Sequence, residues 1–417
     1  MRTLTRKLAI IEPQMLLVGI DLAAEKNVAI VINQQARVVG RIRFAHQRQE
    51  YTMLGERLEQ LRQRHQATGV LVGMEPTNYY WKLVAAELER QGIRYRLVNA
   101  YTVKKHREGD QLDRAKDDDR DGFVIADLLR TGKFTETQLL PGAYAELRQY
   151  SSLYRQQNEA ITRQKILLRQ AVGQTFPELG QVFRDLTGQT AQALLQRHAA
   201  AHVIRQLSEA AFLAAVRTDF QGRRFQVKKL QQAYQLAQHS VGLQATQGLE
   251  LAIQGHLRLL AVQEAHLNQV KEQLVQTFHQ LPQAHYLLTL ALGEVTTALI
   301  LAEIGDPSHY TNARQLVKLA GLQPTPDSSG QKTNSPTPMS GKGRGQLRTT
   351  LYFACLRLIQ QDEAFAARYQ HLQQRPTNPL KGMQALVVLM TKLLRIFWAL
   401  LTQKTAYNPT MEHAQTA

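Results

Sequence analysis

The sequence has little cysteine and no long apolar run that is free of charged residues near either end. Cys355 is the single cysteine in 417 residues, which excludes a disulfide framework and is typical of a reducing cytoplasm. The apolar stretch near the start is broken by Glu12 and Pro13, so no export signal is expected. Two cations interrupt the apolar run at 385–401, which favours a core helix over a membrane span.

Acidic residues are also scarce relative to basic ones. The chain has 51 Lys and Arg against 34 Asp and Glu, a formal net charge of +17. Such an excess attracts polyanions and makes their binding depend on salt, so the charge predicts a nucleic-acid partner. General solubility would explain a smaller excess better than this one. With 44% hydrophobic residues, a chain of this length can form two or three domains with separate cores.

Short apolar runs alternate with helical patterns in the first 135 residues. Strands are predicted at 15–20, 27–32, 36–44, 69–74 and 93–98, and helices at 47–66, 78–91 and 118–131. Three successive strands followed by alternating helices and strands is the element order of a ribonuclease-H-like (RuvC-like) domain. In that fold the first and fourth strands are neighbours at the centre of the sheet.

Four carboxylates occupy positions that this element order would bring together. Asp21 ends the first predicted strand, Glu75 ends the fourth, and Asp118 and Asp121 share a face of the last helix. Carboxylate oxygens suit a hard divalent cation, so we predict a metal site that acts on phosphodiesters. Each acid alone also suits a turn or a helix-dipole role. The acidic run at 117–119 leaves the register open by one residue.

Residues 136–284 are rich in glutamine and follow a helical pattern, which predicts an arm of long helices. Apolar residues repeat every seven positions at Ile253, Leu260, Leu267 and Leu274. The repeat fits a coiled coil between subunits and an intramolecular antiparallel hairpin equally well.

The C-terminal region, 285–403, is helical and is interrupted by a segment rich in Gly and Pro at 321–345. A loop of this length in a compact domain is usually functional or disordered. Residues 404–417 form a polar tail that is expected to fray. The predicted domains are therefore 1–135, 136–284 and 285–403, followed by the tail.

Short motifs surround the four acids: Gly19-Ile-Asp21, Met74-Glu75-Pro-Thr and Lys116-Asp-Asp118-Asp-Arg-Asp121. Two more lie in the C-terminal region, Leu301-Ala-Glu-Ile-Gly-Asp306 and Ala313-Arg-Gln-Leu-Val-Lys-Leu-Ala-Gly-Leu322. Together they resemble the DEDD insertion-sequence transposases and Piv-type invertases, the "IS one-ten" family of bridge-RNA-guided recombinases. Asp117 and Gly122 replace the Thr and Ala of the third motif, but its Asp-x-x-Asp spacing is kept.

The resemblance implies that Ser329, directly before Gly330, is the nucleophile. No histidine base lies near it in the sequence, so activation by metal bound to the four acids is the favoured chemistry. The structural alternative is that Ser328 and Ser329 cap an ordinary turn.

Three groups of basic residues are predicted to contact nucleic-acid phosphates. They are Lys104, Lys105, His106, Arg107 and Lys116 before the acidic helix, Arg223, Arg224, Lys228 and Lys229 in the arm, and Lys342, Arg344 and Arg348 beside the serine. A solvated helix face explains the arm group at least as well. The sequence shows no obvious base-reading helix-turn-helix or zinc finger, which fits a family that leaves sequence choice to RNA pairing.

The resemblance implies a serine-dependent DNA recombinase, the transposase of an insertion sequence, assisted by Mg²⁺ or Mn²⁺. Its implied partners are element and target DNA, a structured guide RNA and further copies of the chain, as a dimer or a dimer of dimers. It would act in the prokaryotic cytoplasm, at the nucleoid and not at a membrane. One alternative is a ribonuclease-H-like nuclease or Holliday-junction resolvase in which water attacks. The other is a non-catalytic helical protein that binds nucleic acid.

Overall fold

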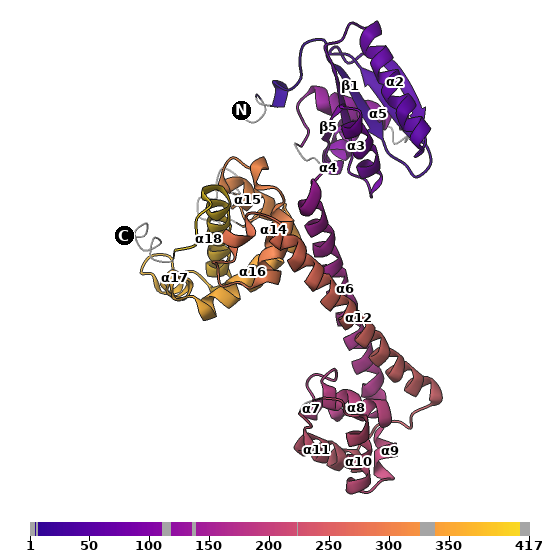
Figure 1. Cartoon of the computed structure of the whole chain (residues 1–417), viewed down its shortest axis with the longest axis vertical. Coiled ribbons are helices and arrows are strands. Elements are labelled where there is room, and N and C mark those ends of the chain that lie inside the picture. Colours follow the sequence, from indigo (N-terminus) through magenta and orange to yellow (C-terminus); the bar gives the residue numbers. More distant parts are fainter. Residues whose placement is uncertain are drawn as a thin grey trace. The chain divides into compact units, whose positions relative to one another are not determined.

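The computed structural model divides the chain into two compact units, Met1–Leu140 and Pro141–Ala417 (Figure 1). The first unit combines a sheet with helices, and the second is helical. The structure describes residues 5, 7–110, 118–135, 139–222, 224–325 and 338–408, without the side chains of 107–110.

A mixed five-stranded sheet forms the centre of the first unit. In sheet order its strands are β3 (Val38–Phe44), β2 (Asn27–Ile32), β1 (Leu16–Asp21), β4 (Val70–Met74) and β5 (Arg94–Leu97). The β1–β2 and β2–β3 pairs are antiparallel, whereas the β1–β4 and β4–β5 pairs are parallel. The five predicted strands are confirmed, and so is the central position of the first and fourth.

Four helices cover the two faces of this sheet: α2 (Arg48–Arg64), α3 (Tyr80–Arg90), α4 (Ala100–Asp110) and α5 (Asp118–Arg130). On one face Leu54 of α2 and Val84 of α3 are buried with Val18 and Val72 of the strands. On the other face α4 and α5 are buried against the opposite side chains of the same strands. The sequence patterns predicted α2, α3 and α5, but not α4, which is mostly polar.

Glycines allow α5 to approach β1 at backbone distance. A Cβ atom on Gly19 would lie 1.9 Å from the carbonyl oxygen of Gly122 and 2.5 Å from the amide nitrogen of Ala126. A Cβ atom on Gly122 would lie 2.8 Å from Cγ1 of Ile30. Gly122 departs from the alanine of the family motif, and the lack of space for a Cβ atom beside Ile30 explains the glycine.

We expect Gly19→Ala to lower the free energy of unfolding of the first unit by more than about 2 kcal/mol, because no rotamer relieves a clash with backbone. Gly69→Ala is the matched control in the same unit. Its Cβ would meet the ends of two side chains and no backbone atom: Arg94 at 3.3 Å and Met15 at 3.6 Å. Urea unfolding can be followed through Trp81 fluorescence in a Trp398→Phe background, since these are the only two tryptophans. Equal unfolding midpoints for the two alanine variants would contradict the packing.

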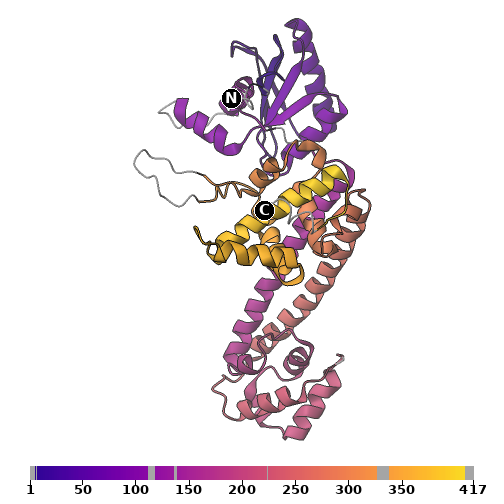
Figure 2. The same ribbon diagram turned by 90° about the vertical axis from the view of Figure 1, so that its left-hand side faces the viewer.

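Two long helices, α6 (Gly142–Thr175) and α12 (Gln247–His279), lie side by side as an antiparallel hairpin in the second unit (Figures 1 and 2). All four residues of the seven-residue repeat are buried. Ile253, Leu260 and Leu267 share a core with Ile161 and Leu168 of α6. The intramolecular alternative therefore accounts for this repeat.

Smaller helices pack at the two ends of the hairpin. The first set lies between α6 and α12 in the sequence and consists of α7 (Leu179–Val182), α8 (Gln189–Arg197), α9 (Ala201–Arg205), α10 (Glu209–Asp219) and α11 (Val227–Gln238). The C-terminal set is α13 (Ala284–Leu287), α14 (Glu294–Ile304), η1 (Pro307–His309), α15 (Ala313–Ala320), α16 (Gly345–Gln361), α17 (Glu363–Gln374) and α18 (Gly382–Gln403).

Helix α18 is long and apolar enough to cross a membrane by length and composition alone. Its side chains at Leu389, Leu393, Leu394 and Phe397 are buried, and it packs on α15, α16 and α17. Helix α18 therefore has the packing expected of a core helix, as its interrupting cations indicated.

Candidate active site

The first two predicted acids lie at the same edge of the sheet, on neighbouring strands. Asp21 is the last residue of β1, and Glu75 directly follows β4. The two strands are parallel with Ile20 opposite Met74, so the register places Asp21 opposite Glu75. Both side chains are half-buried. The predicted meeting of two strand ends is thus present in the backbone.

The other two acids are on the first turn of α5, next to the contact between Gly19 and Gly122. Asp121 directly precedes Gly122, and Asp21 is two residues beyond Gly19, so the glycine contact brings the acidic turn to the end of β1. Asp121 is buried at 7% exposure, whereas Asp118, one turn earlier, is exposed. This contact therefore joins β1 and α5, which carry Asp21, Asp118 and Asp121, and the pairing of β1 with β4 brings Glu75 to the same edge.

Asp119 faces a different set of partners. Its carboxylate lies 2.9 Å from the Arg41 guanidinium and 3.9 Å from that of Arg43, both on β3. Asp119 is therefore engaged with β3, and Asp118 and Asp121 stay the predicted pair at i and i+3. Asp117 lies outside the described residues.

The donor set fits a hard cation in chemistry and in backbone position, because all four candidates offer carboxylate oxygens from adjacent elements. Within the described parts of the chain, no three His, Cys, Asp or Glu side chains are arranged closely enough to hold a metal ion. The structure thus brings the four positions to one edge of the sheet without closing their side chains around a common point.

A hydrogen-bonded network that the sequence patterns missed supports the loop after Asp21. Asn27 is fully buried; its Oδ1 accepts from the Ala23 amide, and its Nδ2 donates to the Phe44 carbonyl. His46 Nε2 lies 2.8 Å from the Ala23 carbonyl oxygen, and its ring stacks on Tyr80 at 5.0 Å. The sequence signal that could have indicated this network is the asparagine at the start of an otherwise apolar strand.

Paired backbone segments hold together the two ends of the segment that contains Ser329. The Thr325 amide donates to the Pro338 carbonyl at 2.9 Å, and the Ser340 amide donates to the Gln323 carbonyl at 2.8 Å. These ends lie between α15 and α16. Ser328 and Ser329 themselves belong to 326–337, outside the described residues.

The Leu301–Asp306 motif supplies a buried anion next to the C-terminal end of that segment. Glu303, only 7% exposed, lies 3.6 Å from the Arg148 guanidinium of α6 and 3.7 Å from that of Arg344, which precedes α16. Burial lowers the pKa of Arg148, and the carboxylate of Glu303 opposes this shift. Arg344 also donates to the Glu303 carbonyl oxygen. Glu303 thereby ties the end of the serine segment to α6.

The predicted phosphate contacts have mixed surroundings. Lys105 lies over the Tyr101 ring at 5.1 Å, and His106 lies 3.3 Å from Asp127. Lys229 lies over the Phe183 ring at 5.4 Å.

Among the predicted contact residues, some bind other protein groups, some are exposed to solvent, and some lie outside the residues that the structure describes. Arg348 donates to the Ala320 carbonyl oxygen at 2.9 Å, and Arg344 binds Glu303 as above. The exposed members are Lys104, Lys105, Arg224, Lys228, Lys229 and Lys342. Lys116, Arg223 and the side chain of Arg107 lie outside the described parts.

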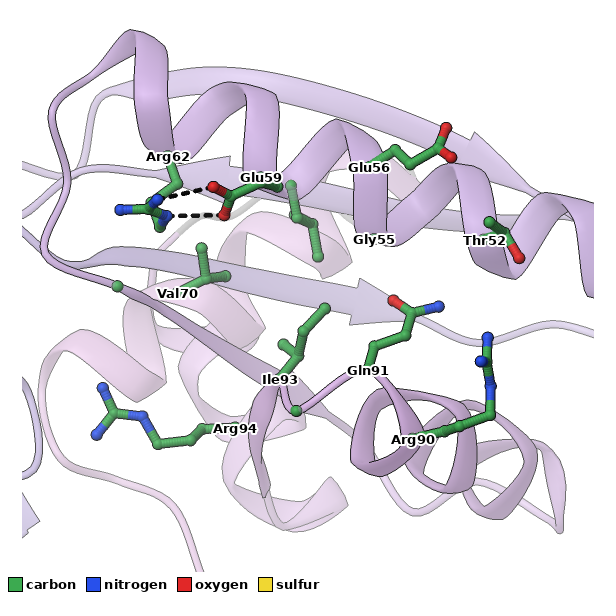
Figure 3. Close-up of a pocket in the computed structure, with 13 residues that line it drawn as sticks. Thr52, Gly55, Glu56, Glu59, Arg62, Val70, Arg90, Gln91, Ile93 and Arg94 are labelled. Atoms are coloured by element: carbon green, nitrogen blue, oxygen red, sulfur yellow. Dashed lines mark hydrogen bonds and ion pairs between the residues drawn. The ribbon is translucent and has the colours of Figure 1, made fainter.

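A cavity of about 610 Å³ in the first unit lies at the opposite end of the strands from the acids (Figure 3). It is lined by Val70 at the start of β4, Arg94 at the start of β5 and residues of α2. Its Arg62 is paired with Glu59 through both carboxylate oxygens, at 2.7 Å each. This cavity is therefore separate from the candidate active site.

Comparison with known proteins gives two family matches along the chain. A family model described as a transposase matches residues 18–177, and a model described as the IS116/IS110/IS902 transposase family matches residues 287–370. The chain belongs to the IS116/IS110/IS902 transposase family. As a transposase it is an enzyme of DNA cleavage and rejoining. The first match contains the four acids, and the second contains Glu303 and both sides of the serine segment.

Individual relatives of this transposase are distant in sequence. It is 24% identical to the "insertion element IS110 uncharacterized 43.6 kDa protein" of Streptomyces coelicolor, over 71% of this chain and 73% of that protein. It is 25% identical to the "pilin gene-inverting protein" of Moraxella lacunata, over 34% of this chain and 45% of that protein. The "probable family 20 transposase" of Pseudomonas aeruginosa is 30% identical, over 28% of this chain and 35% of that protein.

Proposed function

We propose that this transposase is a metal-dependent recombinase whose first unit is a ribonuclease-H-like (RuvC-like) catalytic domain. The observation that carries the proposal is the contact between Gly19 and Gly122, which brings the acidic turn of α5 to the end of β1, the strand that pairs with β4. The sheet order, with β1 and β4 parallel at its centre, is the order of that fold. We further propose a helical arm at 136–284 and a C-terminal transposase domain at 285–403.

Asp21, Glu75, Asp118 and Asp121 would hold Mg²⁺, or Mn²⁺ in its place. A divalent ion held by these carboxylates would stabilise charge at the phosphate and would lower the pKa of the attacking oxygen. The acids themselves provide fixed negative charge on three elements, and the half-buried setting of Asp21 and Glu75 restricts water around them. Their carboxylates can accept the proton that the nucleophile loses.

Ser329 would be the nucleophile. Its oxygen attacks a DNA phosphorus and loses its proton, forming a phosphoserine bond while the bond to one deoxyribose oxygen breaks. That oxygen takes up a proton and leaves as a hydroxyl. The hydroxyl at the end of a DNA strand can then attack the phosphoserine bond and rejoin the DNA. This reversal is possible because each cleaved phosphodiester bond is replaced by a phosphate ester to serine. The paired backbone at 323–325 and 338–340 supports this role by holding together the two ends of the segment that contains Ser329.

The partners that the family resemblance implies complete the proposal. They are element and target DNA, a structured guide RNA and a second copy of the chain, whose serine would act at the acids of its partner. The charge of +17 supports nucleic-acid binding, and the Moraxella relative is named for inverting a gene. The site of action would be the prokaryotic cytoplasm. With the seven-residue repeat already buried, the subunit contact would use other surfaces.

The test combines purification and activity. We expect the full chain, purified without nuclease treatment, to carry structured RNA and to scatter light as a dimer or larger. With that RNA and Mg²⁺ it should recombine a DNA pair that includes an element end. A monomer without RNA that still recombines DNA would refute the guided, dimeric mechanism. Cleavage without rejoining would favour the nuclease alternative, and binding without cleavage would favour the non-catalytic one.

A further inference from the structure

One face of α6 lines two adjoining cavities in the second unit. The larger, about 910 Å³, lies between α6, α14 and α16, and the smaller, about 490 Å³, lies between α6 and residues 184–187. Both are lined by Thr162, Ile166 and Gln170, so they form one concave surface, here named the α6 groove. Its α6 wall runs from residue 154 to 170, about 24 Å at a helical rise of roughly 1.5 Å per residue.

The α6 groove is strongly basic. It is lined by five cations, Arg155, Arg163, Lys165, Arg169 and Arg184, and by two anions, Glu159 and Asp185. A groove with this excess concentrates polyanions at its surface. None of the five cations belongs to the basic groups that the sequence singled out.

The two anions of the groove are bound to neighbouring protein groups, whereas some of its cations remain available to a ligand. Glu159 pairs with Arg155 at 3.1 Å, and Asp185 accepts hydrogen bonds from the amide and hydroxyl of Thr187. Arg163 and Arg184 are exposed, and neither forms a salt bridge with any residue that the structure describes. These two guanidiniums are therefore free to bind phosphate.

The same groove exposes apolar and hydrogen-bonding groups between its cations. The Phe353 ring of α16 is 62% exposed and Ile166 is 53% exposed. Asn158, Thr162 and Gln346 add amide and hydroxyl groups to the lining. An exposed ring can stack only on a base that is not already stacked, which points to a single strand. Hydroxyl and amide groups can bind the ribose 2′-hydroxyl, which distinguishes RNA from DNA.

We propose that the α6 groove binds a single-stranded segment of RNA, with Arg163 and Arg184 on phosphates and Phe353 stacked on a base. The proposal rests on the proposed function only in taking RNA as a partner; the location follows from the groove. Phosphate contacts of this kind depend on salt, whereas stacking depends on it little, so the two roles separate by experiment.

The probe is a fluorescein-labelled 12-nucleotide single-stranded RNA of mixed sequence, with DNA of the same sequence for comparison. Polarisation is measured with the full-length chain at several KCl concentrations. We expect Arg163→Gln/Arg184→Gln to weaken RNA binding about tenfold or more near physiological salt. The slope of log affinity against log salt should also become shallower by about 1.4, for two lost phosphate contacts. Phe353→Ala should weaken binding roughly five- to hundredfold with the salt slope unchanged.

Arg205→Gln/Arg258→Gln is the matched control, because both arginines are exposed in the second unit and lie outside the groove. It removes the same charge and should bind as wild type does. Groove variants that bind RNA like this control would overturn the proposal while leaving an RNA partner intact. Equal affinity of the wild type for the DNA probe would overturn the assignment to RNA. A wild-type chain that binds no RNA at all would remove the partner from the proposed function as well.

Discussion

A Ser329→Ala protein is expected to bind DNA as wild type does and to form no covalent protein–DNA adduct. The hydroxyl oxygen of the nucleophile enters the new bond to phosphorus, so its loss removes the reaction path and not merely a contact. Recombination should fall by roughly 10⁴-fold or more, the scale seen when a nucleophile is deleted. Binding should persist because affinity comes from cations that the substitution leaves in place.

Ser328→Ala is the matched control for this result. The two serines are adjacent, but only Ser329 directly precedes Gly330 as the family motif requires. Wild-type and variant proteins are incubated with end-labelled DNA and Mg²⁺, and the products are separated on a denaturing gel. An adduct that persists in Ser329→Ala and disappears in Ser328→Ala would move the nucleophile by one residue. Wild-type cleavage with no adduct would replace serine attack with attack by water.

Strands β1, β2 and β4 could be predicted from the sequence because they are almost fully buried and therefore form continuous apolar runs. Asp21 ends β1 and Glu75 directly follows β4, so an acid marks the end of each of these two runs. Helix α4 escaped prediction because Val103 is its one buried side chain, apart from residues 107–110, so it has almost no apolar period to read.

Two features could not be predicted from local sequence because they depend on tertiary contacts. They are the surroundings of each aspartate in the acidic run and the helix against which the seven-residue repeat packs. Three adjacent aspartates are equivalent in sequence, and the structure pairs Asp119 with two arginines of β3 that are distant along the chain. The repeat in α12 specifies a helical partner but not whether that partner is α6 or another subunit. The α6 groove combines α6 with α14 and α16, so no local pattern indicates it.

Asp21→Asn and Asp118→Asn should each lower Mg²⁺-dependent strand cleavage by at least about a thousandfold. Asparagine keeps the shape of the side chain but loses the charge that a hard cation requires, so the fold should survive while metal binding fails. DNA affinity should change little, because the lost groups are anionic and the phosphate contacts are cationic.

Asp119→Asn makes the same chemical change one residue from Asp118 and is the matched control. It breaks the ion pairs with Arg41 and Arg43, whose guanidinium groups are more than half exposed. Such pairs contribute about 0–1 kcal/mol to stability, so activity should stay near that of wild type. Cleavage is assayed with labelled DNA across a titration of Mg²⁺ and of Mn²⁺. Loss of activity in Asp119→Asn with Asp118→Asn active would shift the register of the acidic turn, and near wild-type activity in both Asp21→Asn and Asp118→Asn would remove the metal from these carboxylates.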